Sequence, residues 1–96
     1  NPLGAPAPGG PTLSLAASRN PVRDLARLDF TLPLPGRLRL ELIDVAGRRV
    51  QTLRDGLETA GAQSATLDVR GMNAGVYFAR LTTGQGQKSL RVVVVH

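Results

Sequence analysis

The sequence predicts an all-β domain, a sandwich of two antiparallel sheets, and three observations support this fold class. Apolar and polar residues alternate in several short segments, turn residues separate these segments at spacings of roughly 8–12 residues, and no window has the periodicity of an amphipathic helix. A chain of 96 residues suits one domain with a single modest core. Because the chain has no cysteine, packing rather than disulfides must hold that core together.

The first twelve residues differ in composition from the rest of the chain. They contain four prolines and three glycines, which is typical of a linker or an extended arm. We therefore expect residues 1–12 to be such a segment and residues 13–96 to form the sandwich.

About seven segments are expected to be strands, namely residues 12–18, 27–32, 37–44, 49–53, 64–69, 76–81 and 88–95. The clearest is 37–44, where Leu38, Leu40 and Leu42 alternate with charged residues, as in a strand with one wet face. Between the strands, Pro33–Gly36 has turn chemistry, and Gly47 is placed for a positive φ. Residues 54–62 are expected to be a polar loop, and residues 82–88 a flexible hairpin connection.

A small corner around Gly75 is expected to make the sandwich immunoglobulin-like. In such folds a tyrosine near the start of a late strand packs across the end of the core and hydrogen-bonds to the chain just before it. Gly75 would let the chain turn without a Cβ, Tyr77 would point inward, and Phe78 would lie on the opposite face. The alternative is an ordinary half-buried tyrosine on an edge strand.

The formal net charge of +5 raises the question of nucleic-acid binding. Eleven of the twelve basic residues are arginines, but they are spread along the sequence, and only three aromatic residues are available to stack on bases. We therefore interpret the arginines as solvated strand faces and expect no nucleic-acid partner. No stretch approaches the ~18 consecutive apolar residues of a membrane span, and the opening lacks the regions of a signal peptide, so we expect a soluble chain.

Catalytic and metal-binding patterns are weak in this sequence. The one histidine is His96 at the chain end, where we expect a frayed side chain without a partner, and no nucleophile has a neighbouring base. We expect no enzyme activity and no cofactor. Asp44, Asp55, Glu58 and Asp68 could gather around Ca²⁺, but their spacing is not that of a calcium loop, so turn capping is the favoured interpretation.

The order of several motifs resembles a known family. The match runs from Asn20 to the chain end and consists of Asn20-Pro21, Phe30–Pro33, Leu38–Val50, Gly61, Leu67-Asp68, Met72–Tyr77 and a closing basic and apolar strand. This order is similar to that of the type IX secretion C-terminal sorting domain, and to that of the related immunoglobulin-like domain of the flagellar hook-capping protein.

The resemblance implies a function outside the cell. Domains of the sorting family end large secreted bacterial proteins, are read by the outer-membrane export machinery, and are in many cases removed while the cargo is attached to a surface lipopolysaccharide. By position, Asn20 and Pro21 would open the signal, and Gly75 and Tyr77 would form its late turn and strand. The terminal strand used in recognition would consist of Lys88, Arg91, Val92, Val93, Val94 and Val95. The insertion of Ser89, Leu90 and Arg91 after the lysine, and the final His96, depart from the family pattern.

A rival hypothesis is that the chain assembles with copies of itself. The large apolar residues before Asn20 are Leu3, Leu13 and Leu15, and an extended segment could lay them along a sheet edge of its own or of a neighbouring copy. Pairing with a neighbour would give a head-to-tail contact that does not close, and such contacts generate filaments.

Overall fold

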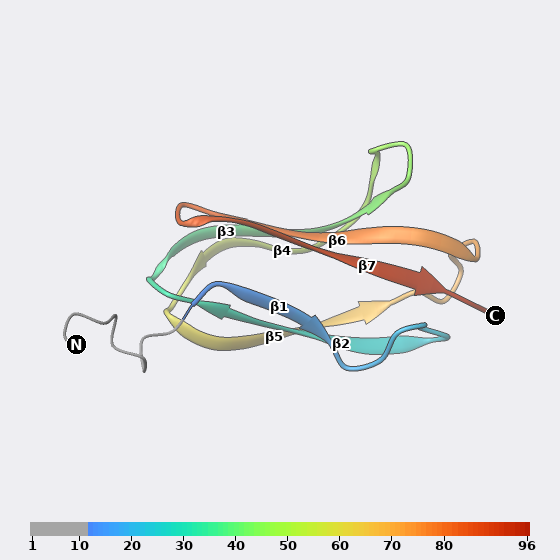
Figure 1. The fold of residues 1–96 in the computed structure, drawn as a ribbon, viewed down its shortest axis with the longest axis horizontal. Coiled ribbons are helices and arrows are strands. Elements are labelled where there is room, and N and C mark those ends of the chain that lie inside the picture. The colour runs from blue at the N-terminus through green and yellow to red at the C-terminus, as the bar shows by residue number, and fades with distance from the viewer. Residues whose placement is uncertain (1–11) are drawn as a thin grey trace.

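The structure, a computed structural model, describes residues 12–96 and is built from β-strands (Figure 1). The strands are β1 (Ser14–Ala17), β2 (Leu25–Leu32), β3 (Gly36–Asp44), β4 (Arg49–Glu58), β5 (Gly61–Asp68), β6 (Gly75–Thr83) and β7 (Gly86–Val94). No helix long and apolar enough to cross a membrane occurs among the described residues.

The strands form two antiparallel sheets that pack face to face (Figure 1). One sheet has three strands in the order β1-β2-β5, and the other has four in the order β4-β3-β6-β7. The predicted all-β, immunoglobulin-like sandwich of seven strands is therefore confirmed.

The alternating leucines of β3 show how the core forms. Leu38, Leu40 and Leu42 all point inward and are at most 2% exposed. They meet the inward residues of the facing sheet, which include Phe30 and Leu67. Burying each such side chain stabilises the fold by about 1.5–3 kcal/mol. The period-two pattern therefore determines which side of each strand faces the other sheet.

The expected polar loop over residues 54–62 is wrong, because β4 continues to Glu58 and only Thr59 and Ala60 separate it from β5. The register between β3 and β4 shifts twice, at Leu40/Glu41 and at Leu42/Ile43. Such bulges put extra residues into one strand and break its alternation. This is why the sequence of β4 does not have the pattern of a regular strand.

The turn between β3 and β4 is organised by Asp44. Its Oδ1 accepts hydrogen bonds from the backbone N–H groups of Ala46 and Arg48, both at 2.9 Å. Gly47 has a φ of +87°, as its position in the sequence predicts. The N–H of Arg48, with help from that of Ala46 and from the Arg48 guanidinium, holds the pKa of Asp44 below its ordinary value.

Candidate recognition site

The two long sides of the sandwich are the places where backbone groups can be left unpaired. β4 and β5 are edge strands on one side, and β1 and β7 are edge strands on the other. An edge strand presents N–H and C=O groups that another chain can pair with.

The β4–β5 side is bridged by side chains. Gln51 of β4 donates from Nε2 to the carbonyl oxygen of Asp68 at 2.8 Å. The guanidinium of Arg54, also on β4, donates to the carbonyl oxygen of Ser64. These two side chains donate hydrogen bonds to outward carbonyl groups of β5, so part of this edge is no longer available to pair with another chain.

On the opposite side, Asn20 is bound to the outer edge of β7. Its Nδ2 donates to the carbonyl oxygen of Arg91 at 2.7 Å, and its Oδ1 accepts from the N–H of Val93 at 3.0 Å. A primary amide carries the same donor and acceptor as a peptide unit. The Asn20 side chain therefore takes the place of a neighbouring strand.

Val22 continues this pairing along β7. Its N–H donates to the carbonyl oxygen of Val93 at 2.7 Å, and its carbonyl accepts from the N–H of Val95 at 2.9 Å. The pairing is parallel, and the Val22 side chain is completely buried in the core. Pro21 lies between the two paired residues, is exposed, and follows a cis peptide bond. Residues 20–22 thus close the second half of the β7 edge.

In the first half of the β7 edge, the outward backbone groups are unpaired among the described residues, although Leu13 lies beside Gly86 at its start. Backbone groups alternate in direction along a strand, and those of Arg91 and Val93 point outward to Asn20 and Val22. Ser89 and Gln87 follow the same alternation in a register without shifts, so their N–H and C=O groups also face outward. They make no backbone hydrogen bond to the described part of the chain.

The corner predicted around Tyr77 is present. Its hydroxyl donates to the carbonyl oxygen of Asn73 at 2.8 Å, and its ring is half-buried against the core rather than fully buried. Gly75 has a φ of +153°. A Cβ built on it would meet nothing within 4 Å, so the backbone angle rather than a clash favours glycine here.

The expectation that His96 is frayed and without a partner is wrong. Its Nε2 lies 2.6 Å from the carbonyl oxygen of Met72, which accepts the hydrogen bond. The sulfur of Met72 in turn accepts from the Gln51 side chain at 3.0 Å. The last residue is therefore tied to the corner loop, a contact across 24 positions that no sequence pattern indicates.

Several residues of the expected signal meet at one end of β7. Gly75 pairs with Val94 and Tyr77 with Val92 on the β6 side of β7, and Asn20 binds the opposite edge of the same strand. Val92 and Val94 point into the core, whereas Val93 and Val95 are half-buried.

Other residues expected to contribute lie elsewhere. Lys88 pairs with Leu81 towards the start of β7 and is exposed, and Gly47 lies in the β3–β4 turn. Leu13 and Leu15 pack against the core of this chain, and Leu3 lies outside the described residues.

The four carboxylates considered for Ca²⁺ do not come together. Each pairs with arginine side chains near it: Asp44 with Arg48, Asp55 with Arg37 and Arg39, Glu58 with Arg54, and Asp68 with Arg70. The side-chain hydrogen bond from Arg70 is the main reason why the pKa of Asp68 is lowered. Within residues 12–96, no group of three or more His, Asp or Glu side chains could hold a metal ion.

An immunoglobulin-like sandwich in which an Asn-Pro motif closes the edge of the last strand is the class of protein that these contacts define. The family model described as "Secretion system C-terminal sorting domain" matches residues 20–95. The chain belongs to this family, the type IX secretion C-terminal sorting domains, which act in sorting proteins for export. β1 precedes the matched residues and is nevertheless paired into the sandwich.

The fold is also similar to that of a solved structure, the crystal structure of dimeric latent PorU from Porphyromonas gingivalis. The TM-score is 0.68 at 21% sequence identity, and the match covers 88% of this chain and 9% of that chain. At this identity the likeness shows the fold alone. A comparison with curated proteins found no match.

Proposed function

We propose that this chain is a non-catalytic signal that the export machinery reads through the edge of β7, and that it serves to place its cargo at the bacterial cell surface. One observation carries the proposal: the Asn20-Pro21 motif and the closing strand, 71 positions apart at the Asn20–Arg91 contact, meet on one edge. Membership of the sorting family supports the export role.

The geometry favours recognition by strand addition. A segment of the machinery would pair with the outward groups of Gln87 and Ser89, and main-chain hydrogen bonds would supply the affinity. Residues 20–22 already occupy the other half of the edge, so the added strand would have a defined end. Such recognition needs no catalytic group.

A substitution at Ser89 tests this proposal. Residues 12–96, which include β1, are fused behind a periplasmic reporter in a bacterium that has the type IX machinery. Ser89→Pro removes the outward N–H, and proline is tolerated on an edge strand where that N–H faces solvent. We expect Ser89→Pro to leave the reporter in the periplasm, whereas Ser89→Ala, which keeps the N–H, is displayed on the surface. Circular dichroism of both purified domains checks that they are folded.

Surface display of Ser89→Pro at the level of the unsubstituted fusion would exclude the open edge from recognition. Failure of every fusion, including the unsubstituted one, would instead contradict the sorting role of the domain itself.

The rival function, self-assembly into a surface filament, needs Leu13 and Leu15 to be available to a neighbouring copy. Both side chains pack against this chain's own core, and Leu15 pairs with Phe30 in β2. We therefore expect the protein to scatter light as a monomer both with and without residues 1–11. A polymer that falls to monomer on this truncation would favour the filament.

A further inference from the structure

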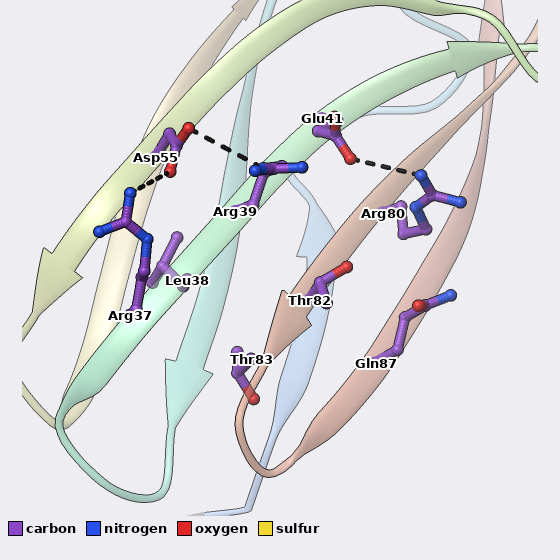
Figure 2. Close-up of a pocket in the computed structure, with 9 residues that line it drawn as sticks. All are labelled: Arg37, Leu38, Arg39, Glu41, Asp55, Arg80, Thr82, Thr83 and Gln87. Atoms are coloured by element: carbon purple, nitrogen blue, oxygen red, sulfur yellow. Dashed lines mark hydrogen bonds and ion pairs between the residues drawn. The ribbon is translucent and has the colours of Figure 1, made fainter.

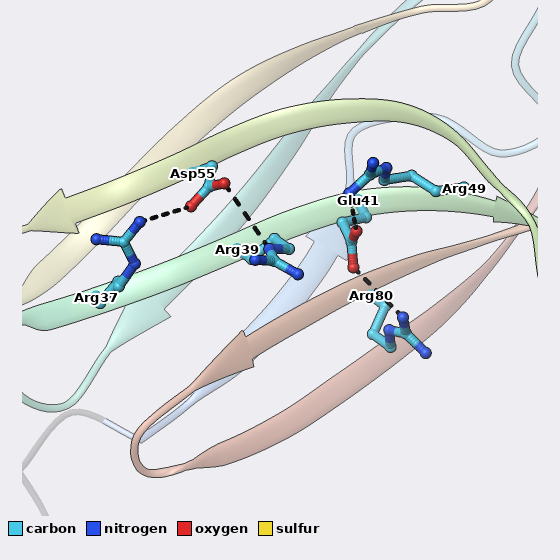
Figure 3. Close-up of polar contacts among 6 residues, drawn as sticks. All are labelled: Arg37, Arg39, Glu41, Arg49, Asp55 and Arg80. Atoms are coloured by element: carbon cyan, nitrogen blue, oxygen red, sulfur yellow. Dashed lines mark hydrogen bonds and ion pairs between the residues drawn. The ribbon is translucent and has the colours of Figure 1, made fainter.

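The outer face of the four-stranded sheet gathers arginines that the sequence spreads over more than fifty positions. Five arginines lie on this face, namely Arg37 and Arg39 of β3, Arg49 of β4, Arg80 of β6 and Arg91 of β7. The face carries two carboxylates, Glu41 and Asp55 (Figure 3). Three of the five net positive charges of the chain therefore lie here. The arginines lie on a solvated strand face, as expected, but those that the sequence disperses are gathered on one sheet.

Each carboxylate on this face is shared between two arginines. Asp55 lies 3.6 Å from Arg37 and 3.8 Å from Arg39, distances beyond the normal hydrogen-bond range. Glu41 is only 4% exposed and lies 3.4 Å from both Arg49 and Arg80 (Figure 3). The Nε of Arg80 is buried without a hydrogen-bond partner among the described residues. The side chains of Arg37, Arg39 and Arg80 are nevertheless partly or largely exposed, so their outward N–H groups can donate to a further carboxylate.

Three of these arginines line an open pocket of about 520 Å³ between β3, β4, β6 and β7 (Figure 2). Arg37, Arg39 and Arg80 contribute positive charge, and the carboxylates Glu41 and Asp55, which also line the pocket, offset part of it. Thr82, Thr83 and Gln87 add neutral hydrogen-bonding groups. An acidic side chain that enters the pocket can therefore accept hydrogen bonds from several of these groups.

An apolar strip adjoins this pocket on the same face. Val76 and Phe78 of β6 are 37% and 38% exposed. The register places Ile43 opposite Phe78 on one side and Val93 opposite Val76 on the other. Arg80 is the next outward residue after Phe78 on β6, so charge and apolar surface are contiguous.

We propose that this face docks a segment of a partner protein in which Asp or Glu residues alternate with large apolar side chains. The carboxylates would enter the pocket and bind Arg37, Arg39 and Arg80, while an apolar side chain would cover Phe78. Aromatic and arginine residues around a small apolar centre are what protein interfaces are enriched in. A nucleic-acid backbone fits less well, because its phosphates carry no apolar side chain that could cover the exposed Val76 and Phe78. The proposal concerns the sheet face and does not depend on the edge of β7.

A designed probe tests this docking surface. The probe is a fluorescein-labelled peptide of eight residues in which glutamate and leucine alternate, and its binding is followed by fluorescence anisotropy at low and physiological salt. Two probes serve for comparison. One is the same peptide with serines in place of the leucines, and the other is a thymidine oligonucleotide of the same net charge. We expect the leucine peptide to bind most tightly and the oligonucleotide most weakly.

Three variants locate the binding. Arg39→Gln is expected to weaken binding roughly twofold to fivefold, the range of one exposed ion pair. Asp55→Asn, which frees Arg37 and Arg39, is expected to strengthen it by a similar factor. Arg27→Gln is the matched control, since it removes one charge from the outer face of the other sheet, where Arg27 pairs with Asp29, and should leave the affinity unchanged.

The proposal is wrong if the peptide fails to bind at millimolar concentration, if the oligonucleotide binds as tightly as the peptide, or if Arg27→Gln weakens binding as much as Arg39→Gln. Replacing Phe78 by serine supplies a second measurement. The substitution should weaken the binding of the leucine peptide and leave the binding of the serine peptide unchanged. Equal losses of affinity for both peptides would also contradict the proposal.

Discussion

At Gly75 the chain adopts a φ of +153°, in a region that residues with a Cβ rarely occupy. We expect Gly75→Val to lower the free energy of unfolding by about 1–3 kcal/mol, through backbone strain. Gly36→Val is the matched control, because a Cβ at Gly36 would also meet no atom within 4 Å, but Gly36 has no such positive φ. Chemical denaturation of both variants measures the difference, and equal stabilities would show that the corner does not need glycine.

Asp44 gives the fold a pH dependence whose sign follows from its contacts. Hydrogen bonds from the turn lower its pKa in the folded state, so the unfolded chain binds the proton more readily. The stabilisation is present above the unfolded pKa of about 4 and is lost as the pH falls through the lower folded value. The pKa of Asp68 is lowered in the same direction by Arg70.

We therefore expect the melting temperature to fall between pH 5 and pH 2, and to fall less in Asp44→Asn. Asparagine keeps an oxygen that can accept from the N–H groups of Ala46 and Arg48, but it does not titrate. Thermal melts of the two proteins across this range give the comparison. If Asp44→Asn loses as much stability as the parent over this pH range, other groups cause the pH dependence.

The sequence predicts individual residues well where the cause is local. Gly47 needs a positive φ because of its own turn, and Tyr77 reaches a carbonyl only four positions earlier. The partner of His96 and the two arginines that share Glu41 depend on how distant strands align. Spacing along one segment carries no information about such contacts.

Among the elements, β7 and the segment of residues 20–22 form the most informative pair. Asn20→Ala removes both side-chain hydrogen bonds to the β7 edge. We expect a loss of about 1 kcal/mol in stability and faster hydrogen exchange at the Val93 N–H. Asn73→Ala is the control, because Asn73 is bonded through its backbone carbonyl, and it should leave exchange at Val93 unchanged. Slow exchange at Val93 in Asn20→Ala would mean that the amide does not close the edge.

The elements also show where sequence patterns fail. Regular alternation in β2 and β3 predicts their inward faces, since every second residue is buried in the regular parts of both strands. The bounds of β4 could not be predicted from alternation, because two bulges shift its register and Gly56 leaves a position without a side chain. The pairing of Val22 with β7 was also not predictable, since a single parallel bridge has no sequence period.

On the scale of the whole molecule, the terminal strand is part of the core as well as of the expected signal. Removing residues 88–96 takes away Val92 and Val94, each worth about 1.5–3 kcal/mol when buried, and leaves one side of β6 unpaired. Since small domains are stable by only about 5–15 kcal/mol, we expect this truncation to be unfolded by circular dichroism. A truncated domain with a cooperative melt would show that β7 is dispensable for folding.

The position of β7 also has a mechanical consequence. Leu13, just before β1, lies beside Gly86 at the start of β7, so both strands begin at one end of the sandwich, and β7 finishes at the other (Figure 1). A force that separates these two ends acts along β1 and β7, whereas their hydrogen bonds run across the strands. Such a pull shears a whole row of bonds together instead of opening them one after another. The domain can therefore bear tension as a unit. We expect it to resist a force along the strands far more than a force that separates an edge strand from its neighbour bond by bond.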